Sequence, residues 1–502
     1  MIRAAPQRAL DALEVFVLTS LDQALTGAYD PAAGETTVLD LFQSVARDVP
    51  AYASFLGAHG VDPASIRTLA DFQQLPLTNK RNYLYGHPLA DLCRMGTLAE
   101  IDMVAVSSGS TGQPTLWPRS LVDELPIARR FEQVFFDSFR SDRQTTLAVV
   151  CFALGTWVGG MYTAQSCRYL AARGYPLTVI TPGNNKAEIL RVVRELGDQF
   201  QQVVLLGYPP FLKDVIDAGL AEGVQWSRLR IKLVMAGEVF SEEWRALVGQ
   251  RTGSTQPYFD SASLYGTADA GVLGNETPLS ICIRRYLAEH PEPAHSLFGE
   301  SRLPTLVQYD PRVRFFEEQD RTLLFSGDNG VPLVRYHIAD SGGLIGYEEM
   351  LTFLAARGFD PVAEVRRFSD RGSRPLPFVY VFGRADFTVS YFGANVFPEN
   401  VTVGLEQSPI DQWVTGKFVM QAREDDDRNP YLSIVVELGP GAAPSDDKTE
   451  AIADSVLRQL LRLNSEFAHY VPRERQRPRI QLAPMGDPEW FPVGVKHRYT
   501  RR

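Results

Sequence analysis

Seven segments between residues 145 and 253 alternate between short apolar runs and amphipathic stretches with helical periodicity. The apolar runs are LAVVCFAL, LTVIT, QVVLLG and IKLVMAG, and the amphipathic stretches are AEILRVVREL, PFLKDVIDAGL and SEEWRALVGQ. Strands that read as continuous Val, Ile and Leu are buried on both faces, as in parallel βαβ units covered by helices. The pattern therefore predicts an α/β core.

Later segments favour strands. RTLLFSG, VPLVRYHI and FVYVFGR predict a strand-rich subdomain, as a second sheet or a barrel, that closes the large domain. After Asp386 the order strand, turn, strand, linker, helix, strand predicts a compact α+β unit of roughly 115 residues, a usual domain size. We expect a large domain over residues 1–386 and a small C-terminal domain over residues 387–502.

Composition bounds the class of partner. The chain has 502 residues, 45% of them hydrophobic, and a formal net charge of -10. This balance excludes disorder, and the absence of a basic block argues against nucleic-acid binding, so we expect a small-molecule partner. The seven histidines are scattered without metal-ligand spacing. Four cysteines without a CxxC motif fit a reducing cytoplasm. They are Cys93, Cys151, Cys167 and Cys282.

Residues 147–164 are uncharged and long enough to suggest a membrane span. Gly155, Gly159 and Gly160 interrupt them after a β-branched run, which favours a buried strand, a glycine turn and the start of a helix. The N-terminus has an amphipathic pattern and no signal-peptide pattern. We therefore expect neither export nor membrane insertion.

The stretch VSSGSTGQPT, residues 106–115, places two glycines among small hydroxyl residues. Such a loop lets backbone N–H groups curl round an anion while hydroxyls donate further hydrogen bonds, which predicts a phosphate-binding loop. No GK[ST] follows, so it is not the P-loop of nucleotide hydrolases. It also lacks the G-x-S-x-G spacing of a serine hydrolase. A Ser/Gly surface linker is the alternative.

Four further segments occur in a fixed order along the chain, one before this loop and three after it. They are LPLTNK at 75–80, LYGTAD at 264–269, PLVRYHIAD at 332–340 and GRADFTVSYFGANVFPENV at 383–401. Together the set resembles the adenylate-forming superfamily of acyl-CoA synthetases, peptide-synthetase adenylation domains and luciferases. Within that superfamily it is most similar to the phenylacetate-CoA ligase branch, from about residue 70 to the C-terminus.

The resemblance implies a nucleotide site. Tyr265 would stack on adenine beside Gly237 and Glu238, Asp340 would bind the ribose with help from Arg384, and Asp269 would bind Mg²⁺, a cation that prefers carboxylate oxygens. Taken singly, a packed aromatic and a turn aspartate would also explain Tyr265 and Asp340. The remaining residues that the resemblance assigns to ATP are Ser107, Ser108, Gly109, Ser110, Thr111 and Gly112, on the phosphates, and Gly266 and Thr267.

The resemblance also implies a mobile C-terminal domain that turns about a hinge at Asp386 and brings Lys496 to the reacting groups. An ammonium there would neutralise charge developing between the acid and the α-phosphate. The alternative is a solvated tail lysine among arginines. The acid would lie near Trp157, Gly159 and Gly160, and Trp157 would suit a flat aromatic ring. A core tryptophan beside a glycine turn is the alternative there.

Four positions depart from the family pattern. Ala268 replaces a Ser or Thr, Asp269 replaces a Glu and is one methylene shorter, and Ala339 replaces a Gly. Lys496 follows Val495 instead of Gly, with one residue fewer after the preceding proline. None of these changes abolishes adenylation on chemical grounds. They indicate a specialised member.

The expected function is ATP-dependent activation of a carboxylic acid as an acyl-adenylate with release of pyrophosphate, followed by transfer to CoA. The resemblance to the named branch implies an aromatic acid. Two alternatives remain open. The adenylate could pass to an amine acceptor, or the acid could be unusual, even nitrite in diazo formation. The chain could also be a catalytically silent nucleotide-binding relative. The sequence indicates no oligomeric state.

Overall fold

The computed structural model describes most of the 502 residues. The described residues are 7–107, 115–156, 158–237, 239–300, 302–384, 389–391, 394–425, 430–464, 467–468, 471, 473–492 and 497–500.

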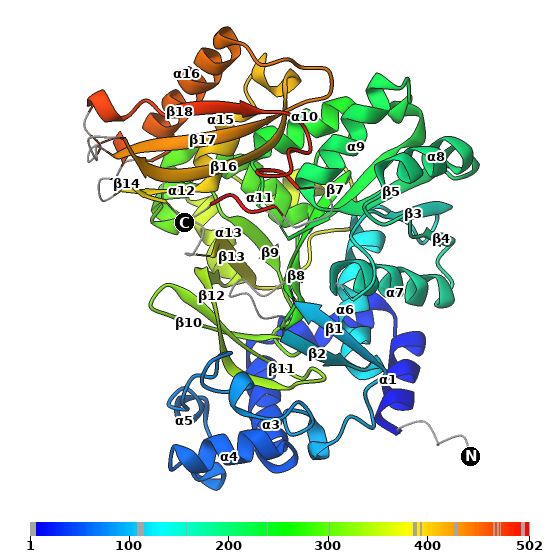
Figure 1. Ribbon diagram of the computed structural model, residues 1–502. Helices are drawn as coiled ribbons and strands as arrows, with labels where there is room; N and C mark the ends of the chain where they lie inside the picture. The colour runs from blue at the N-terminus through cyan, green and yellow to red at the C-terminus, as the bar shows by residue number, and fades with distance from the viewer. Residues whose placement is uncertain are drawn as a thin grey trace.

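The alternation over residues 145–253 folds into the parallel half of an 11-stranded sheet, in the order β7-β6-β5-β3-β4 (Figure 1). All neighbours in this half are parallel. The predicted α/β core is therefore confirmed. Its strands are β3 (Thr146–Val150), β4 (Leu177–Ile180), β5 (Gln202–Gly207), β6 (Ile231–Ala236) and β7 (Ser261–Thr267), and its helices are α6 (Leu121–Gln133), α7 (Val158–Ala172), α8 (Lys186–Leu196), α9 (Pro209–Ala221) and α10 (Glu242–Thr252).

Alternate residues of these strands pack against opposite helical layers. Val203 and Leu205 of β5 join a cluster with side chains of α8, α9 and α10. Val204 and Leu206 of the same strand join a cluster with side chains of α6 and α7. Burial on both faces explains why the runs are apolar throughout. Among the described helices, none is both long and apolar enough to cross a membrane.

The strand-rich part extends the same sheet, in the order β10-β11-β12-β13-β9-β8-β7. The predicted strand-rich region is confirmed. It is not a second sheet or barrel, because the β7–β8 hairpin continues the sheet with antiparallel pairing and needs no crossover helix. The strands are β8 (Gly271–Asn275), β9 (Thr305–Gln308), β10 (Phe315–Gln319), β11 (Thr322–Gly327), β12 (Leu333–Ile345) and β13 (Phe378–Arg384), with helices α11 (Pro278–Glu289), α12 (Pro291–Phe298), α13 (Tyr347–Ala355) and α14 (Pro361–Arg366).

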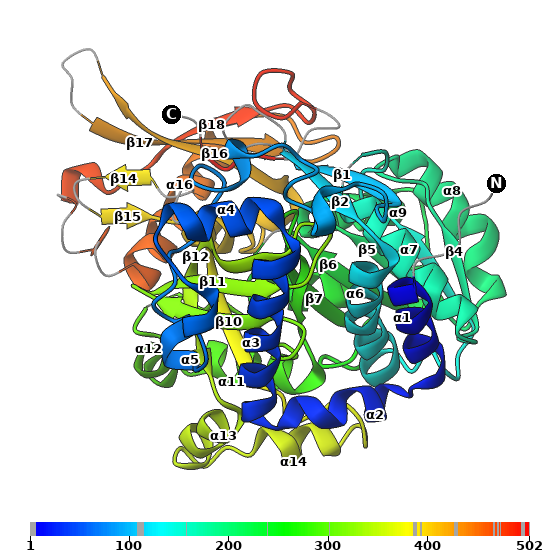
Figure 2. The same ribbon diagram turned by 90° about the horizontal axis from the view of Figure 1, so that it is seen from below.

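The N-terminal helices cover the far end of this sheet. Phe42 of α3 and Tyr52 of α4 share a buried cluster with Phe316 of β10 and Phe325 of β11, and Figure 2 shows α3 alongside these strands. α1 lies instead against α6, where the Arg129 guanidinium stacks over the Phe16 ring at 4.6 Å. The elements are α1 (Gln7–Leu18), α2 (Leu21–Thr26), α3 (Pro31–Asp48), α4 (Pro50–Ala58), α5 (Leu69–Phe72), β1 (Met103–Ser107) and β2 (Thr115–Arg119).

The C-terminal part has its own three-stranded sheet, order β16-β17-β18, and its own buried cluster with α15 and α16. The expected order of strand, strand, helix and strand appears, and residues 426–429, where the turn was expected, lie outside the described residues. Asp386 lies outside the described residues, so the division at that position stays a prediction. The elements are β14 (Val389–Tyr391), β15 (Ala394–Val396), α15 (Pro398–Leu405), β16 (Val414–Glu424), β17 (Pro430–Leu438), α16 (Asp446–Leu463) and β18 (Arg479–Ala483).

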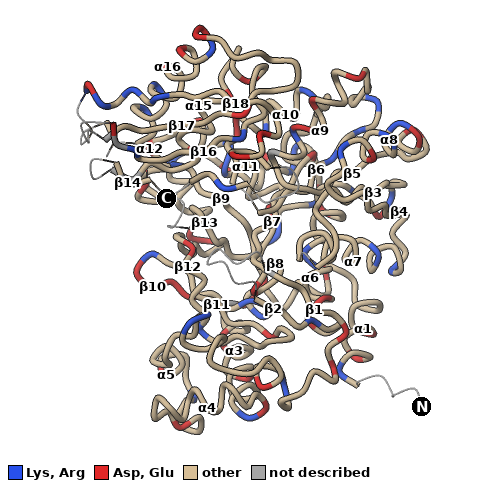
Figure 3. Tube along the Cα trace, in the orientation of Figure 1, with Lys and Arg blue, Asp and Glu red and all other residues tan. Residues whose placement is uncertain are grey.

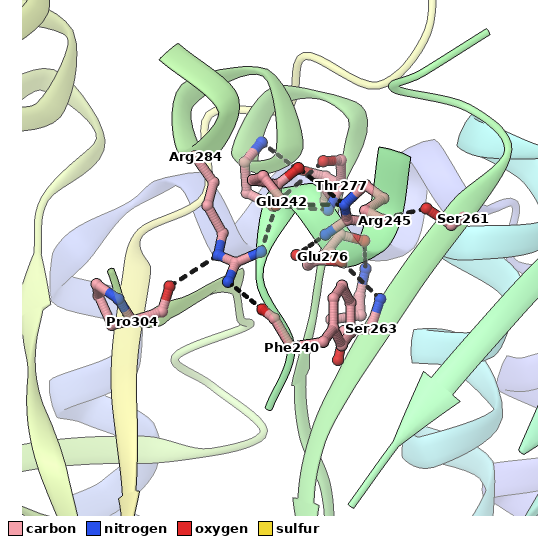
Figure 4. Close-up of polar contacts among 11 residues, drawn as sticks. Phe240, Glu242, Arg245, Ser261, Ser263, Glu276, Thr277, Arg284 and Pro304 are labelled. Carbon is pink, nitrogen blue, oxygen red and sulfur yellow. Dashed lines mark hydrogen bonds and ion pairs between the residues drawn. The ribbon is translucent and has the colours of Figure 1, made fainter. Parts of the chain in front are cut away.

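A buried ion network ties α10 and α11 to the middle of the sheet (Figure 4). Arg245 donates to Glu242 at 3.0 Å and to Glu276 at 2.6 Å, and Arg284 also pairs with Glu242. Burial opposes ionisation, yet the two guanidinium groups hold the pKa of Glu242 below its ordinary value. Elsewhere Lys and Arg alternate with Asp and Glu along the chain (Figure 3).

The C-terminal part lies beside α9 and α10 (Figure 1), and polar side chains join them. Lys417 of β16 pairs with Asp214 of α9 at 2.9 Å and with Glu437 at 3.0 Å. Arg251 of α10 pairs with Asp411 at 3.6 Å. The hydroxyl of Ser241, which caps α10, bonds the carboxyl of Glu406 after α15. These contacts cross between the predicted domains.

Glu406 makes this interface sensitive to pH. Burial raises the pKa of its carboxyl to about 8, aided by Glu243 and opposed by Ser241, Lys213 and Arg284. The folded protein therefore keeps a proton that the unfolded chain releases, and stability falls as pH rises from about 5 to about 8. Glutamine carries no titrating proton. In Glu406→Gln we therefore expect the fall in the free energy of unfolding over this pH range to be smaller by roughly 1–3 kcal/mol, a usual range for a buried polar group.

Urea unfolding at pH 5.5, 7 and 8 measures this difference. The exposed Glu289 provides a control, Glu289→Gln, in which the pH dependence should match that of wild type. Parallel pH curves for wild type and Glu406→Gln would show that Glu406 ionises freely in the folded protein.

Candidate active site

The hairpin of β1 and β2 brackets the predicted phosphate loop. The strands pair antiparallel, and Ser107 at the end of β1 faces Thr115 at the start of β2. Ser108, Gly109, Ser110, Thr111 and Gly112 lie outside the described residues. Trp117 of β2 is buried, so the hairpin packs into the molecule as a fixed base for the loop.

A three-residue turn between β7 and β8 carries Asp269. Tyr265, Gly266 and Thr267 are the last residues of β7, and Thr267 pairs with Gly271 across the turn. The Thr267 hydroxyl accepts a hydrogen bond from the Ala270 amide at 3.1 Å, which closes the turn. Asp269 is 4% exposed, so its carboxylate faces the interior of the molecule.

Two tyrosine–aspartate hydrogen bonds join β7 to β12 in reciprocal fashion. Tyr265 of β7 donates to Asp340 of β12 at 2.7 Å. Tyr336 of β12 donates to Asp269, just after β7, at 2.6 Å. The two strands are separated in the sheet by β8, β9 and β13. The structure therefore brings together two motifs that lie about 70 residues apart, as expected of a shared site.

Residues 75–80 add a short extension beside β12. Thr78 donates from its amide to the Arg335 carbonyl at 3.1 Å and accepts from the His337 amide at 2.8 Å. The Arg335 guanidinium holds the Leu75 carbonyl at 2.5 Å. This pairing fixes the path of the LPLTNK segment, which ends in Lys80.

Lys80 reaches the carboxylate of Asp269. Its Nζ lies 3.3 Å from Asp269 Oδ1 and 5.6 Å from the centre of the Trp117 ring. The site thus holds a lysine between the Asp269 turn and the phosphate-loop hairpin. Lys80 and Tyr336 are not among the site residues predicted from the sequence. Lys80 had one usable signal, since it is a lysine inside a motif of an arginine-rich chain.

Gly237 and Gly159 approach the same aromatic side chain. Gly237 has a φ of +83°, and a Cβ there would lie 2.7 Å from the Tyr208 ring, so only glycine fits. A Cβ at Gly159 would lie 3.7 Å from the Tyr208 hydroxyl and 3.5 Å from Phe152. At Gly160 a Cβ would clash with the Ala153 carbonyl at 2.3 Å. The predicted acid and adenine regions are therefore neighbours. Glu238 and Trp157 lie outside the described residues.

The remaining predicted residues are only partly placed. Arg384 ends β13 and is the register partner of Asp340 on β12, so the backbones of these two residues lie side by side. Lys496 and Asp386 lie outside the described residues. Phe491 and His497, on either side of the segment with Lys496, both anchor to the C-terminal sheet: Phe491 packs on Val419, and His497 bonds the Phe418 carbonyl at 2.7 Å.

Asp269 provides the oxygen ligand type that Mg²⁺ prefers. Its two oxygens already contact Lys80 and Tyr336. Among the described residues there is no group of three or more His, Cys, Asp or Glu side chains that could hold a metal alone. A magnesium ion would fit here only together with phosphate oxygens and water, as in a nucleotide complex.

Comparisons with known proteins show which sequences and folds this chain is similar to. No family model matches the chain. The phenylacetate-coenzyme A ligase of Thermus thermophilus is 23% identical over 370 residues, which cover 72% of each protein. That of Aromatoleum evansii is 23% identical over 229 residues, which cover 44% of this chain and only 47% of the relative. A crystal structure of 2-hydroxyisobutyryl-CoA ligase in the postadenylation state, with R3-HIB-AMP, matches 97% of this chain and 92% of its own, with a TM-score of 0.66 at 14% identity.

The chain is similar in sequence to two phenylacetate-coenzyme A ligases, and it shares the fold of 2-hydroxyisobutyryl-CoA ligase. The fold match extends over both the large sheet and the C-terminal part, since it covers nearly the whole chain.

Ala339 has a φ of +60°, in the left-handed region. The family pattern has glycine there, which adopts this conformation without a Cβ penalty of about 1–2 kcal/mol. Glycine also costs about 0.5–1 kcal/mol through the more flexible unfolded chain. We expect Ala339→Gly to raise the free energy of unfolding by about 0.5–1 kcal/mol.

Denaturant unfolding of both proteins tests this expectation. Ala236→Gly, at a strand position without positive φ, is the control and should lower stability. If Ala339→Gly destabilises the protein as much as the control does, Ala339 carries no strain.

Proposed function

We propose that this ligase activates a carboxylic acid with ATP and then transfers the acyl group to CoA. A carboxylate oxygen attacks the α-phosphorus of ATP, the bond to pyrophosphate breaks, and an acyl-adenylate forms. The CoA thiol then attacks the acyl carbon, and AMP leaves with the oxygen that came from the acid. AMP serves as a leaving group because a free carboxylate resists attack.

One observation carries the proposal: the reciprocal Tyr265–Asp340 and Tyr336–Asp269 pairs, with Lys80 between Asp269 and the phosphate-loop hairpin. Asp340 would accept hydrogen bonds from the ribose, with Arg384 on the adjacent strand. Tyr265 and Gly237 would line the adenine site. The loop 107–112 would hold the phosphates, close to the ammonium of Lys80.

Mg²⁺ would enter with the nucleotide, with Asp269 as its protein ligand, and would stabilise the departing pyrophosphate. Lys80 would stay beside Asp269 and add a fixed positive charge. Lys496 would supply a second charge near the α-phosphate during adenylation alone.

The acid would be aromatic. Phe152 and Tyr208 form an edge-to-face pair with ring centres 4.9 Å apart, beside Gly159 and near Gly237. These two aromatic rings and the absent side chain at Gly159 would give a flat ring apolar neighbours. The two curated relatives are both named phenylacetate-coenzyme A ligase, which supports the same class of acid.

A pyrophosphate-release screen tests this function. Aryl acids, fatty acids and nitrite are each supplied with ATP and Mg²⁺, with CoA, with an amine, or with neither. We expect release to depend on an aryl acid, and thioester to form only with CoA. ATP binding without acid-dependent release would identify a catalytically silent relative, and amide formation in place of thioester would assign an amine acceptor.

A further inference from the structure

Two buried arginines hold all three backbone carbonyls of the turn that carries Asp269. The Arg119 guanidinium donates to the Ala268 carbonyl at 2.5 Å and to the Asp269 carbonyl at 3.3 Å. The Arg314 guanidinium donates to the Ala270 carbonyl at 2.9 Å. A turn this short cannot satisfy these carbonyls itself, so the arginines fix its path.

Both guanidinium groups are costly to bury. Arg119 is 0% exposed and Arg314 is 2% exposed. The nearest carboxylate to Arg119 is that of Asp123, at 3.7 Å. No carboxylate forms an ion pair with Arg314 among the described residues, and burial lowers the pKa of Arg314 to about 10. Apolar side chains would fill this space at a lower cost in free energy. We therefore attribute the two buried arginines to their hydrogen bonds with the turn carbonyls.

Arg119 connects the Asp269 turn to the predicted phosphate loop. Arg119 is the last residue of β2, which leads directly out of the predicted phosphate loop. Asp123, its partner in α6, accepts from the Gly330 amide at 2.8 Å and thereby anchors this end of the hairpin. Arg314 precedes β10 and also donates to Asn329 at 2.8 Å. The Asp269 turn is therefore fastened to the hairpin on one side and to the antiparallel half of the sheet on the other.

We propose that Arg119 and Arg314 are positioning residues that set the Asp269 carboxylate relative to the phosphate-loop hairpin. The inference rests on the proposed function and extends it, because the geometry they set is the one that receives the β- and γ-phosphates of ATP. The one-methylene-shorter carboxylate of Asp269 has less reach than a glutamate. A fixed backbone beneath it keeps that carboxylate against Lys80 and Tyr336.

Arg119→Lys tests the role of the hydrogen bonds from Arg119 to the turn carbonyls. Lysine keeps the charge but loses the planar fork that reaches two carbonyls at once. We expect ATP affinity, measured by calorimetry with Mg²⁺, to fall by about tenfold or more, since charge-assisted contacts depend on donor geometry. AMP affinity should stay within about twofold, because AMP lacks the β- and γ-phosphates and a defect confined to them cannot affect it. A general loss of structure would weaken both nucleotides.

Two controls separate positioning from folding. Arg130→Lys alters another buried arginine, which bonds Gln133 at 3.1 Å away from the Asp269 turn, and should leave both affinities unchanged. In an Asp269→Asn background, Arg119→Lys should have little further effect on ATP, since residues acting through one group are not additive. Equal losses in both backgrounds, or equal losses for ATP and AMP, would overturn the inference.

Hydrogen exchange of the nucleotide-free protein measures directly how firmly the Asp269 turn is held. Arg119→Lys should speed exchange over residues 267–271, including the Ala270 amide, by about tenfold, as expected for a local opening made easier. Unchanged exchange would overturn the inference even if ATP still binds to the wild type. If the wild type binds neither ATP nor AMP, the proposed function fails, and the role of the arginines in nucleotide binding fails with it.

Discussion

Lys496→Ala is expected to lower acid-dependent pyrophosphate release by about a hundredfold or more, the scale of losing one preorganised charge-stabilising donor. Lys496 would contact the reacting groups only during adenylation, so its loss raises that barrier alone. ATP affinity should barely change, because the nucleotide contacts come from the large domain. Transfer to CoA from a chemically prepared acyl-adenylate should also survive.

One variant in two assays is therefore decisive for Lys496. Lys448→Ala removes a lysine from α16 of the same C-terminal part and should leave both half-reactions intact. If Lys496→Ala adenylates at the wild-type rate, Lys496 is a solvated tail residue and Arg498 becomes the next candidate. His497 is a poor substitute, because burial lowers its pKa to about 4 and keeps it neutral at physiological pH.

Gly112→Val is expected to weaken ATP binding by at least about a hundredfold, the scale of losing two charge-assisted hydrogen bonds of about 1.5–3 kcal/mol each. A phosphate-binding loop works by bringing backbone N–H groups close to the anion, and a branched side chain prevents that approach. The fold should be unaffected, because the hairpin that brackets the loop packs through residues such as Trp117.

Calorimetry with ATP, together with a thermal melt, measures both parts of this expectation. Gly57→Val in α4 is a matched control, since Gly57 is exposed and a Cβ there meets nothing within 4 Å. Undiminished ATP affinity in a folded Gly112→Val protein would remove the loop from the nucleotide site.

Local periodicity was sufficient to predict the parallel half of the sheet. Each strand such as β5 is apolar on both faces and is followed by an amphipathic helix such as α9, so the signal lies within about 20 residues. The antiparallel half has no such signal. β13 pairs with β9, and Tyr380 faces Leu306, a pairing set by the closure of the whole sheet and not by either segment.

The candidate site was predicted as a list of motifs, and the structure adds how four of them meet. The hydroxyls of Tyr265 and Tyr336 each cross to the other motif's aspartate, a relation that spacing along the chain cannot show. Lys80 was not predicted as a site residue, because its position depends on the pairing of Thr78 with β12, more than 250 residues away. Arg119 was not predicted for the same reason, since the carbonyls to which it donates belong to a turn distant in sequence.

In the proposed reaction, a carboxylate oxygen of the acid becomes bonded to the α-phosphorus of ATP. Supplying the acid with both carboxylate oxygens labelled as ¹⁸O, together with ATP, Mg²⁺ and CoA, tests this directly by mass spectrometry of the products. The proposed chemistry predicts one ¹⁸O atom in each AMP formed and none in pyrophosphate. Unlabelled AMP, or label in inorganic phosphate, would contradict an acyl-adenylate intermediate.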